Sequence, residues 1–310
     1  MRTCPPTSPP LRRSTGPCRT GWPTQRTDVS RRLRLDAELV RRGLARSRSH
    51  AADLIGAGRV QIDGRPATKP ATQLATAQAL RVLQDPAGAA PEYVSRGGHK
   101  LAGALDALGE RAPVIEGRRV LDAGASTGGF TDVLLRRGAA HVVAVDVGYG
   151  QLAWALRNDE RVTVAERTNV RALTPEQVGA APGLVVADLS FISLTVVLPA
   201  LVAVSEPRAD MLLMVKPQFE VGRERLGSGG VVRDPGLHIW AVQHVAEAAA
   251  RLGAGVLAVV PSPLPGPSGN VEYFLHLRCG APGERTAVAG ADLRAVIDAA
   301  VRTGPAGGGP

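Results

Sequence analysis

The stretch that decides the fold reads VLDAGASTGGF and spans residues 120–130. An apolar run that ends in a glycine-rich turn and continues into a helix is typical of the first strand, turn and helix of a nucleotide-binding α/β domain. Asp146 ends the next apolar run, 22 residues after Gly124, where a carboxylate can accept hydrogen bonds from a ribose diol. The dinucleotide pattern requires glycine at position 126, where this chain has Ser126. The turn therefore disfavours a pyrophosphate cofactor and favours S-adenosylmethionine, which carries no phosphate.

Apolar and amphipathic segments alternate on the C-terminal side of residue 118. Strands are predicted at 119–123, 141–146, 162–165, 184–188, 210–216, 255–260 and 271–277. Helices are predicted at 128–137, 151–157, 194–204 and 236–252. This alternation predicts an α/β, Rossmann-like fold over residues 94–282, with a mostly parallel seven-stranded sheet and helices on both faces. We expect a C-terminal helix and a disordered tail over 283–310.

The excess positive charge is confined to the first third of the chain. The net charge is +9, and counting by segment gives +11 for residues 1–100 and −2 for residues 101–310. Residues 1–31 are rich in Pro, Ser, Thr and Arg and predict a disordered basic tail. This distribution is what a nucleic-acid-binding appendage on an otherwise ordinary enzyme would show.

Residues 32–83 predict a small α+β domain of two short helices and a hairpin that turns at Asp63-Gly64. Residues 84–93 are rich in Pro, Ala and Gly and read as a linker. Arginines cluster where the two helices meet, and such a patch can contact the phosphates of a folded RNA. The candidate RNA-binding residues are Arg41, Arg42, Arg46, Arg48 and Arg59.

Lysine is rare in this chain and marks candidate catalytic positions. Only three of the 37 basic residues are Lys, and lysine can lose its proton where arginine cannot. Lys216 ends an apolar strand, and a buried charge of this kind needs a carboxylate partner. Asp188 ends another strand, Glu272 enters the last one, and Lys100 precedes the first. Two lysines and two carboxylates can neutralise one another around one site.

Several other classes of protein are disfavoured by the sequence. The three cysteines form no CxxC pair and the six histidines are scattered, so we expect neither a disulfide framework nor a metal site. No segment approaches the roughly 18 apolar residues of a membrane span, and the N-terminus lacks the apolar core of a signal peptide. We therefore expect a cytoplasmic protein without a membrane partner, and a monomer.

The N-terminal segment resembles an S4 RNA-binding domain. The resemblance covers about residues 32–83. It rests on the order of Arg34-Leu35-Asp36, Gly43, Ser47-Arg48, Gly58-Arg59-Val60 and Lys69-Pro70.

The remainder of the chain resembles FtsJ-like RNA ribose 2′-O-methyltransferases, because Lys100, Asp188, Lys216 and Glu272 match their Lys-Asp-Lys-Glu tetrad. With the leading S4-like segment, the chain resembles the TlyA (hemolysin A) family over about residues 32–280. The segments that carry this likeness are SRGGHKL, DAGASTGGF, ERTNVR, ADLSFISL, MVKPQFEVGRE and GNVEYFL.

The resemblance implies an S-adenosylmethionine-dependent enzyme that methylates the 2′-oxygen of cytidine in ribosomal RNA, so that ribosomal subunits are its partners. It also implies that the tetrad is catalytic. Adding the turn residues, the candidate cofactor-binding residues are Gly124, Ala125, Ser126, Gly128, Phe130, Asp146, Asn169 and Asp188.

Two versions of the chemistry remain open at this point. Lys216 acts as a general base if it loses its proton, which Lys100 favours and the two carboxylates oppose. Alternatively, Lys216 steers a lone pair of the ribose oxygen and the proton leaves late. Three other functions compete: a non-enzymatic RNA-binding or ribosome-assembly protein, a membrane-lytic hemolysin, and an NAD-dependent oxidoreductase. The filled tetrad disfavours a non-enzymatic protein. The apolar strands belong in a buried sheet, which disfavours a membrane-lytic protein. Ser126 disfavours an NAD-dependent oxidoreductase.

Overall fold

The computed structural model describes residues 33–45, 48–75, 78–83, 93–280 and 290–304. The chain divides into two compact units, Met1–Leu83 and Gln84–Pro310, which we treat separately. The predicted tail at 1–31, Arg46, nearly all of the predicted linker and the last six residues lie outside the described residues.

The N-terminal unit contains the two helices and the hairpin that the sequence predicts. Its elements are β1 (Leu33–Arg34), α1 (Leu35–Arg41), α2 (Arg48–Gly56), β2 (Val60–Ile62), β3 (Arg65–Pro66), β4 (Gln73–Leu74) and β5 (Leu80–Val82). Asp63 and Gly64 join β2 to β3 with positive φ angles of 48° and 80°, as a two-residue hairpin turn requires. Leu35 and Leu39 of α1 pack with Leu54 and Ile55 of α2 in a small core.

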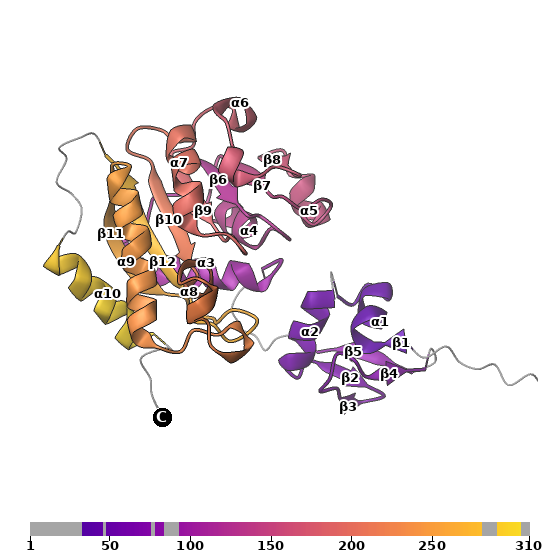
Figure 1. Ribbon diagram of the computed structural model, residues 1–310. Helices are drawn as coiled ribbons and strands as arrows, with labels where there is room; N and C mark the ends of the chain where they lie inside the picture. The colour runs from indigo at the N-terminus through magenta and orange to yellow at the C-terminus, as the bar shows by residue number, and fades with distance from the viewer. Residues whose placement is uncertain (1–32, 46–47, 76–77, 84–92, 281–289, 305–310) are drawn as a thin grey trace, which may run out of the picture. The chain divides into compact units, whose positions relative to one another are not determined.

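The C-terminal unit is built on a seven-stranded sheet in the order β11-β12-β10-β9-β6-β7-β8 (Figure 1). The strands are β6 (Arg119–Ala123), β7 (His141–Val145), β8 (Val162–Ala165), β9 (Leu184–Ala187), β10 (Asp210–Val215), β11 (Ala254–Pro261) and β12 (Tyr273–Cys279). Only β12 pairs antiparallel with its neighbours, β10 and β11. The remaining pairs are parallel, which confirms the mostly parallel sheet.

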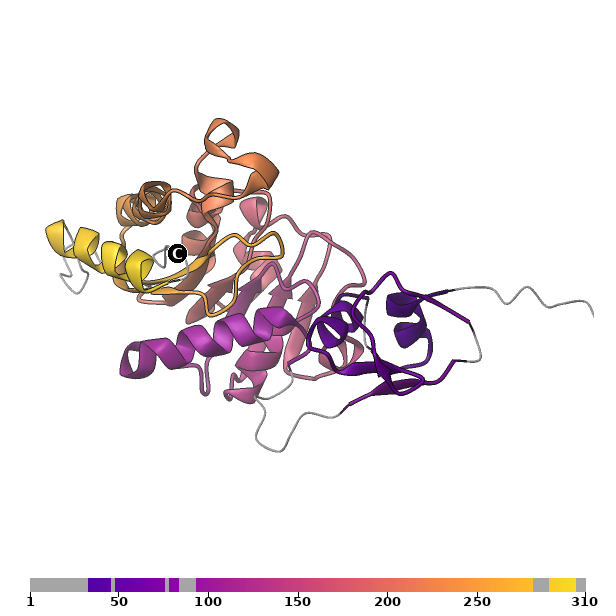
Figure 2. The same cartoon turned by 90° about the horizontal axis from the view of Figure 1, so that it is seen from below.

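Longer helices cover both faces of this sheet, as Figure 2 shows from below. One face carries α7 (Leu194–Val204), α9 (Pro235–Arg251) and α10 (Ala291–Thr303), and the other carries α3 (Arg96–Leu108) and α4 (Gly129–Arg136). Alternate residues of β6 face opposite sides of the sheet. Leu121 and Ala123 pack in the core beneath α7, α9 and α10, and Val120 packs in the core beneath α3 and α4. Both faces are buried, which explains why the strands read as continuous apolar runs. Helix α10 lies within the segment 283–310, where we expected a C-terminal helix.

Short helices complete the unit. They are η1 (Gly109–Arg111), α5 (Trp154–Arg157), η2 (Val170–Ala172), α6 (Pro175–Val178), α8 (Pro217–Glu220), η3 (Arg223–Arg225) and η4 (Ser228–Gly230). The sequence did not predict α3, which is amphipathic and buries Leu101 and Leu105 against α4 and the sheet. Within the described parts of the chain, no helix is both long and apolar enough to span a membrane.

The sheet reverses its strand order beside β6, and this places the ligand crevice. The chain runs from β6 outward to β7 and β8, then returns to the other side of β6 for β9 and β10. Crevices for ligands open at the carboxyl ends of strands at such a switch point. Here Asp188 N donates to Ala123 O, so the ends of β9 and β6 are joined. Gly124 has φ +88°, and a Cβ there would lie 2.6 Å from the carbonyl oxygen of Asp188, so the close approach requires glycine.

Candidate active site

Two cavities open side by side at the carboxyl ends of the central strands. The first, of about 440 Å³, lies beyond β6, β7 and β9 and is lined by Gly124, Asp146 and Asp188 among others. The second, of about 640 Å³, lies beyond β10 and β12 and is lined by Lys216 and Glu272 among others. The two share a common wall of three residues, Ser190, Phe191 and Ile192. The arrangement suits a reaction between two molecules bound next to each other.

The first cavity gathers most of the predicted cofactor-binding residues. Five of them line it: Gly124, Ser126, Asp146, Asn169 and Asp188. None of the described residues that line it is Arg or Lys, and two are carboxylates. Such a lining does not suit a pyrophosphate and does suit a cationic or hydroxyl-bearing ligand.

Asp146 organises the mouth of this cavity. Its Oδ2 accepts a hydrogen bond of 2.8 Å from Ser126 N, and its Oδ1 accepts one of 2.6 Å from Gly148 N. Ser126 has φ +47°, an unusual conformation for a residue with a side chain, and the bond to Asp146 holds it there. Each carboxylate oxygen has a further acceptor position that a ligand hydroxyl can use.

Three predicted cofactor-binding residues do not line either cavity. Ala125 is buried, and Phe130 is buried and stacks on Phe274 with ring centroids 6.0 Å apart. Gly128 has φ +97° and caps α4, and a Cβ there would collide with Leu156. In this structure these residues support the glycine-rich turn on the side away from the cavity and do not line it.

The tetrad residues form two ion pairs. Lys216 Nζ lies 2.6 Å from Asp188 Oδ1, and it also donates to Ser190 Oγ at 3.1 Å. Lys100 Nζ lies 2.5 Å from Glu272 Oε2, and both of these side chains are almost fully buried. Each lysine therefore has the carboxylate partner that its burial requires. Lys216 and Glu272 face the same cavity, and Lys100, on α3, supports Glu272 from behind.

The loop that lines the second cavity, residues 222–230, is fastened to the segment that leads through Glu272 into β12. Asn270 is buried, accepts a hydrogen bond from Val232 N at 3.0 Å, and donates to Gly230 O at 3.1 Å. His238 Nε2 contacts Val232 O, and its Nδ1 contacts the hydroxyl of Tyr273. These contacts tie the glycine-rich segment after Lys216 to β12 and α9, so its far end is held in place.

Asp122 is a buried carboxyl behind the first cavity. It is fully buried on β6, and its Oδ2 accepts a hydrogen bond of 2.6 Å from Thr131 Oγ1. Burial raises its pKa to about 7, and the nearby charge of Asp188 adds to this effect. The group is therefore largely protonated below neutral pH.

Three of the candidate RNA-binding arginines of the N-terminal unit are held by two buried carboxylates. Glu38 binds Arg41 and Arg42, and Asp36 binds Arg48. Hydrogen bonds from Arg41 lower the pKa of Glu38 to about 2. Arg59 donates to the carbonyl of Leu83. Arg46 lies outside the described residues.

The sequence reasoning missed the shared wall. Phe191 is 91% exposed and has φ +65°, so an aromatic ring in a strained backbone stands between the two cavities. Ser190, beside it, contacts Lys216. The signal available in the sequence was their position directly after the strand end at Asp188. Among the described residues, no group of three or more His, Cys, Asp or Glu is placed to hold a metal ion.

Comparisons with known proteins agree on both units. The FtsJ-like methyltransferase family model matches residues 93–279, and the S4 domain model matches residues 33–77. The 16S/23S rRNA (cytidine-2′-O)-methyltransferase TlyA of Mycobacterium tuberculosis is 64% identical over 250 residues, 81% of this chain and 91% of that protein. Hemolysin A of Brachyspira hyodysenteriae is 36% identical over 79% of this chain and 99% of that protein. The solved structure of a candidate hemolysin from Streptococcus thermophilus has 35% identity and a TM-score of 0.68, covering 87% of this chain and 96% of that one.

Proposed function

Because the chain belongs to the FtsJ-like methyltransferase family, we propose that it transfers the methyl group of S-adenosylmethionine to a ribose 2′-oxygen of ribosomal RNA. The name of the M. tuberculosis relative supports cytidine as the nucleoside. The observation that carries the proposal is the pair of adjoining cavities, with Asp188 lining one and Lys216 lining the other across a contact of 2.6 Å.

The smaller cavity is the proposed cofactor site. Gly124, Ser126, Asp146, Asn169 and Asp188 would hold S-adenosylmethionine there, with Asp146 accepting from its ribose hydroxyls. When bound, this cofactor supplies an activated methyl group on a sulfonium. The absence of Arg and Lys among the described lining residues, and the presence of two carboxylates, fit a ligand with positive charge and no phosphate.

The larger cavity is the proposed site of the target nucleotide. A lysine ammonium has three N–H donors. Lys216 donates to Ser190 Oγ, and its ammonium also forms an ion pair with Asp188, so a remaining N–H donor can meet the ribose 2′-oxygen in the cavity. The contacts with Asp188 and Ser190 fix the position of the ammonium, so we propose that Lys216 steers a lone pair of the oxygen toward the methyl group. Alignment of two bound reactants is the main contribution required, since the methyl group is already activated.

The hydroxyl proton needs an acceptor once the new carbon–oxygen bond forms. Glu272 lines the same cavity, and its Oε2 is held by Lys100. We propose that Glu272 receives the proton directly or through water. Lys100 acts by fixing the orientation of that carboxylate. Ala125, Gly128 and Phe130 support the glycine-rich turn.

We propose that residues 94–282 perform catalysis and that residues 32–83 anchor the RNA through the arginines held by Asp36 and Glu38. The excess of positive charge in residues 1–100 supports this division. Both cavities are lined by one chain, so a monomer suffices for the reaction. A ribosomal substrate would place the reaction in the cytoplasm.

The test is methyl transfer from labelled S-adenosylmethionine to purified small and large ribosomal subunits, followed by mapping of 2′-O-methyl nucleotides. We expect label on ribose in RNA and none with the Lys216→Ala variant. Label on a base, or cofactor binding without transfer to either subunit, would contradict the proposal. The second outcome would favour a non-enzymatic role in ribosome assembly.

A further inference from the structure

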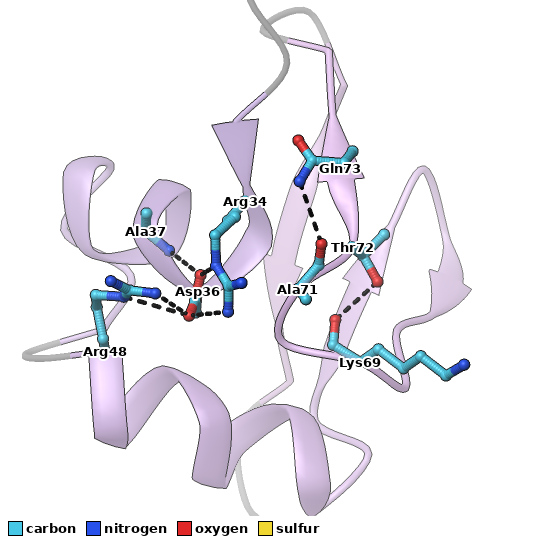
Figure 3. Close-up of polar contacts among 8 residues, drawn as sticks. All are labelled: Arg34, Asp36, Ala37, Arg48, Lys69, Ala71, Thr72 and Gln73. Atoms are coloured by element: carbon cyan, nitrogen blue, oxygen red, sulfur yellow. Dashed lines mark hydrogen bonds and ion pairs between the residues drawn. The ribbon is translucent and has the colours of Figure 1, made fainter.

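One buried carboxylate of the N-terminal unit holds two arginines from different elements (Figure 3). Arg34, at the end of β1, donates to Asp36 through Nε and Nη2, both at 3.0 Å. Arg48, at the start of α2, donates to the same carboxylate through Nη2 at 2.8 Å. Both Nη2 atoms contact one oxygen, Oδ2, so the two guanidinium groups lie next to each other.

The carboxylate is fixed and the arginines are open to solvent. Asp36 is 5% exposed, whereas the side chains of Arg34 and Arg48 are 45% and 61% exposed. A guanidinium has five N–H donors, and Arg34 directs only two of them at Asp36. Hydrogen bonds from the arginines, Arg34 first, lower the pKa of Asp36, so it is ionised at neutral pH.

The backbone around Asp36 is also fixed by hydrogen bonds. Leu35 N donates to Thr72 O, and Asp36 N donates to Pro70 O. Asp36 Oδ1 also accepts a hydrogen bond from Ala37 N, in the first turn of α1. Thr72 Oγ1 in turn donates to Lys69 O, which braces the receiving loop (Figure 3). The carboxylate oxygen that contacts both arginines is therefore held in a fixed position by the backbone around it.

We propose that Asp36 is a positioning residue for RNA binding, which holds Arg34 and Arg48 together as a paired fork for RNA phosphate. Two free arginines would repel each other and lose side-chain freedom on binding. The shared carboxylate offsets both costs before RNA arrives. The inference rests on the proposed function in one respect, that the ligand is RNA.

The Asp36→Asn variant distinguishes this proposal from simple electrostatics, because the two predict opposite changes in RNA affinity. Removing a negative charge from an RNA-binding surface should strengthen RNA binding if charge alone matters. Positioning predicts the reverse, since the asparagine amide presents N–H donors to the arginine N–H groups. We expect the affinity for purified ribosomal RNA to fall about tenfold. The magnitude of the slope of log affinity against log salt concentration should decrease by about 1.

Asp63→Asn is the matched control. Asp63 belongs to the same unit and carries the same charge, but it accepts hydrogen bonds from Gln78 and Ala79 and from no arginine among the contacts described. Its replacement should leave RNA affinity unchanged or slightly raised. If Asp36→Asn behaves in the same way, Asp36 does not position the arginines and the proposal is wrong.

A second background distinguishes positioning from a general loss of fold. In a chain that carries Arg34→Ala and Arg48→Ala, Asp36→Asn should cause no further loss of RNA affinity, because no arginine remains to be held. A further loss there would show that Asp36 acts through the fold alone and would overturn the proposal. Circular dichroism verifies that each variant is folded. The readout is RNA binding, so failure of methyl transfer would count against the proposed function and not against this inference.

Discussion

Replacing Asp122 by asparagine should change how the stability of the C-terminal unit depends on pH. Asp122 is fully buried, and burial raises its pKa to about 7 from an ordinary value of 3.8. The folded chain therefore keeps a proton on this carboxyl over a pH range in which the unfolded chain has lost it. By linkage, this favours the folded state at low pH, and the benefit is lost as pH rises from about 4 to about 7.

The expected magnitude follows from the pKa of Asp122 in the folded chain and its ordinary value in the unfolded chain. A tenfold difference between the two acid dissociation constants corresponds to about 1.4 kcal/mol, so the full effect has an upper limit of about 4 kcal/mol. Between pH 5.5 and pH 8, the contribution of Asp122 to the free energy of unfolding should fall by about 2 kcal/mol. Asparagine has the shape of the protonated acid and does not titrate, so Asp122→Asn should remove this part of the pH dependence.

Urea unfolding followed by circular dichroism at the two pH values measures the effect. We expect Asp122→Asn to be stabilised relative to the natural chain at pH 8 by about 2 kcal/mol more than at pH 5.5. Asp106→Asn is the control, because it removes the same charge from a side chain that is 69% exposed. Equal pH dependence in Asp122→Asn and the natural chain would refute the reasoning from burial.

Substitutions at three residues test the proposed site further. Lys216→Ala should abolish methyl transfer and leave cofactor affinity nearly unchanged, because Lys216 reaches the cofactor cavity only through its contact with Asp188. Lys216→Arg should fail too, since a planar guanidinium cannot replace the compact ammonium. Asp146→Ala should weaken cofactor binding in calorimetry by about 1–3 kcal/mol while RNA binding without cofactor stays constant. Asn270→Ala should raise KM for ribosomal RNA by about tenfold, because it loses both hydrogen bonds to the loop. Asn270→Asp should raise KM less, because it keeps the acceptor for Val232 N. An unchanged KM in Asn270→Ala would mean that the loop is held without it.

The sequence by itself determined the elements of the catalytic fold, because local pattern is enough to specify them. The short continuous apolar runs at 184–187 and 211–215 favour strands buried on both faces, and Gly124 marks the close approach of the first turn to β9. The pairing of Lys and carboxylate charges could also be expected, since a buried ion needs a partner. Helix α3 was missed because its first turn contains Gly97 and Gly98, which are poor helix formers, and packing against α4 decides the conformation there.

Only the tertiary structure decided which groups meet. Lys216 pairs with Asp188, and Lys100 with Glu272, although the second pair is separated by 172 residues in the chain. Phe130 was expected at the cofactor and lies in the core, while Phe191 was not singled out and stands exposed between the cavities. The physical reason is that side-chain contacts across a sheet depend on strand order and register, which sequence periodicity does not encode. A period of two residues tells which face a side chain takes, and only the order β10-β9-β6 tells which neighbour it meets there.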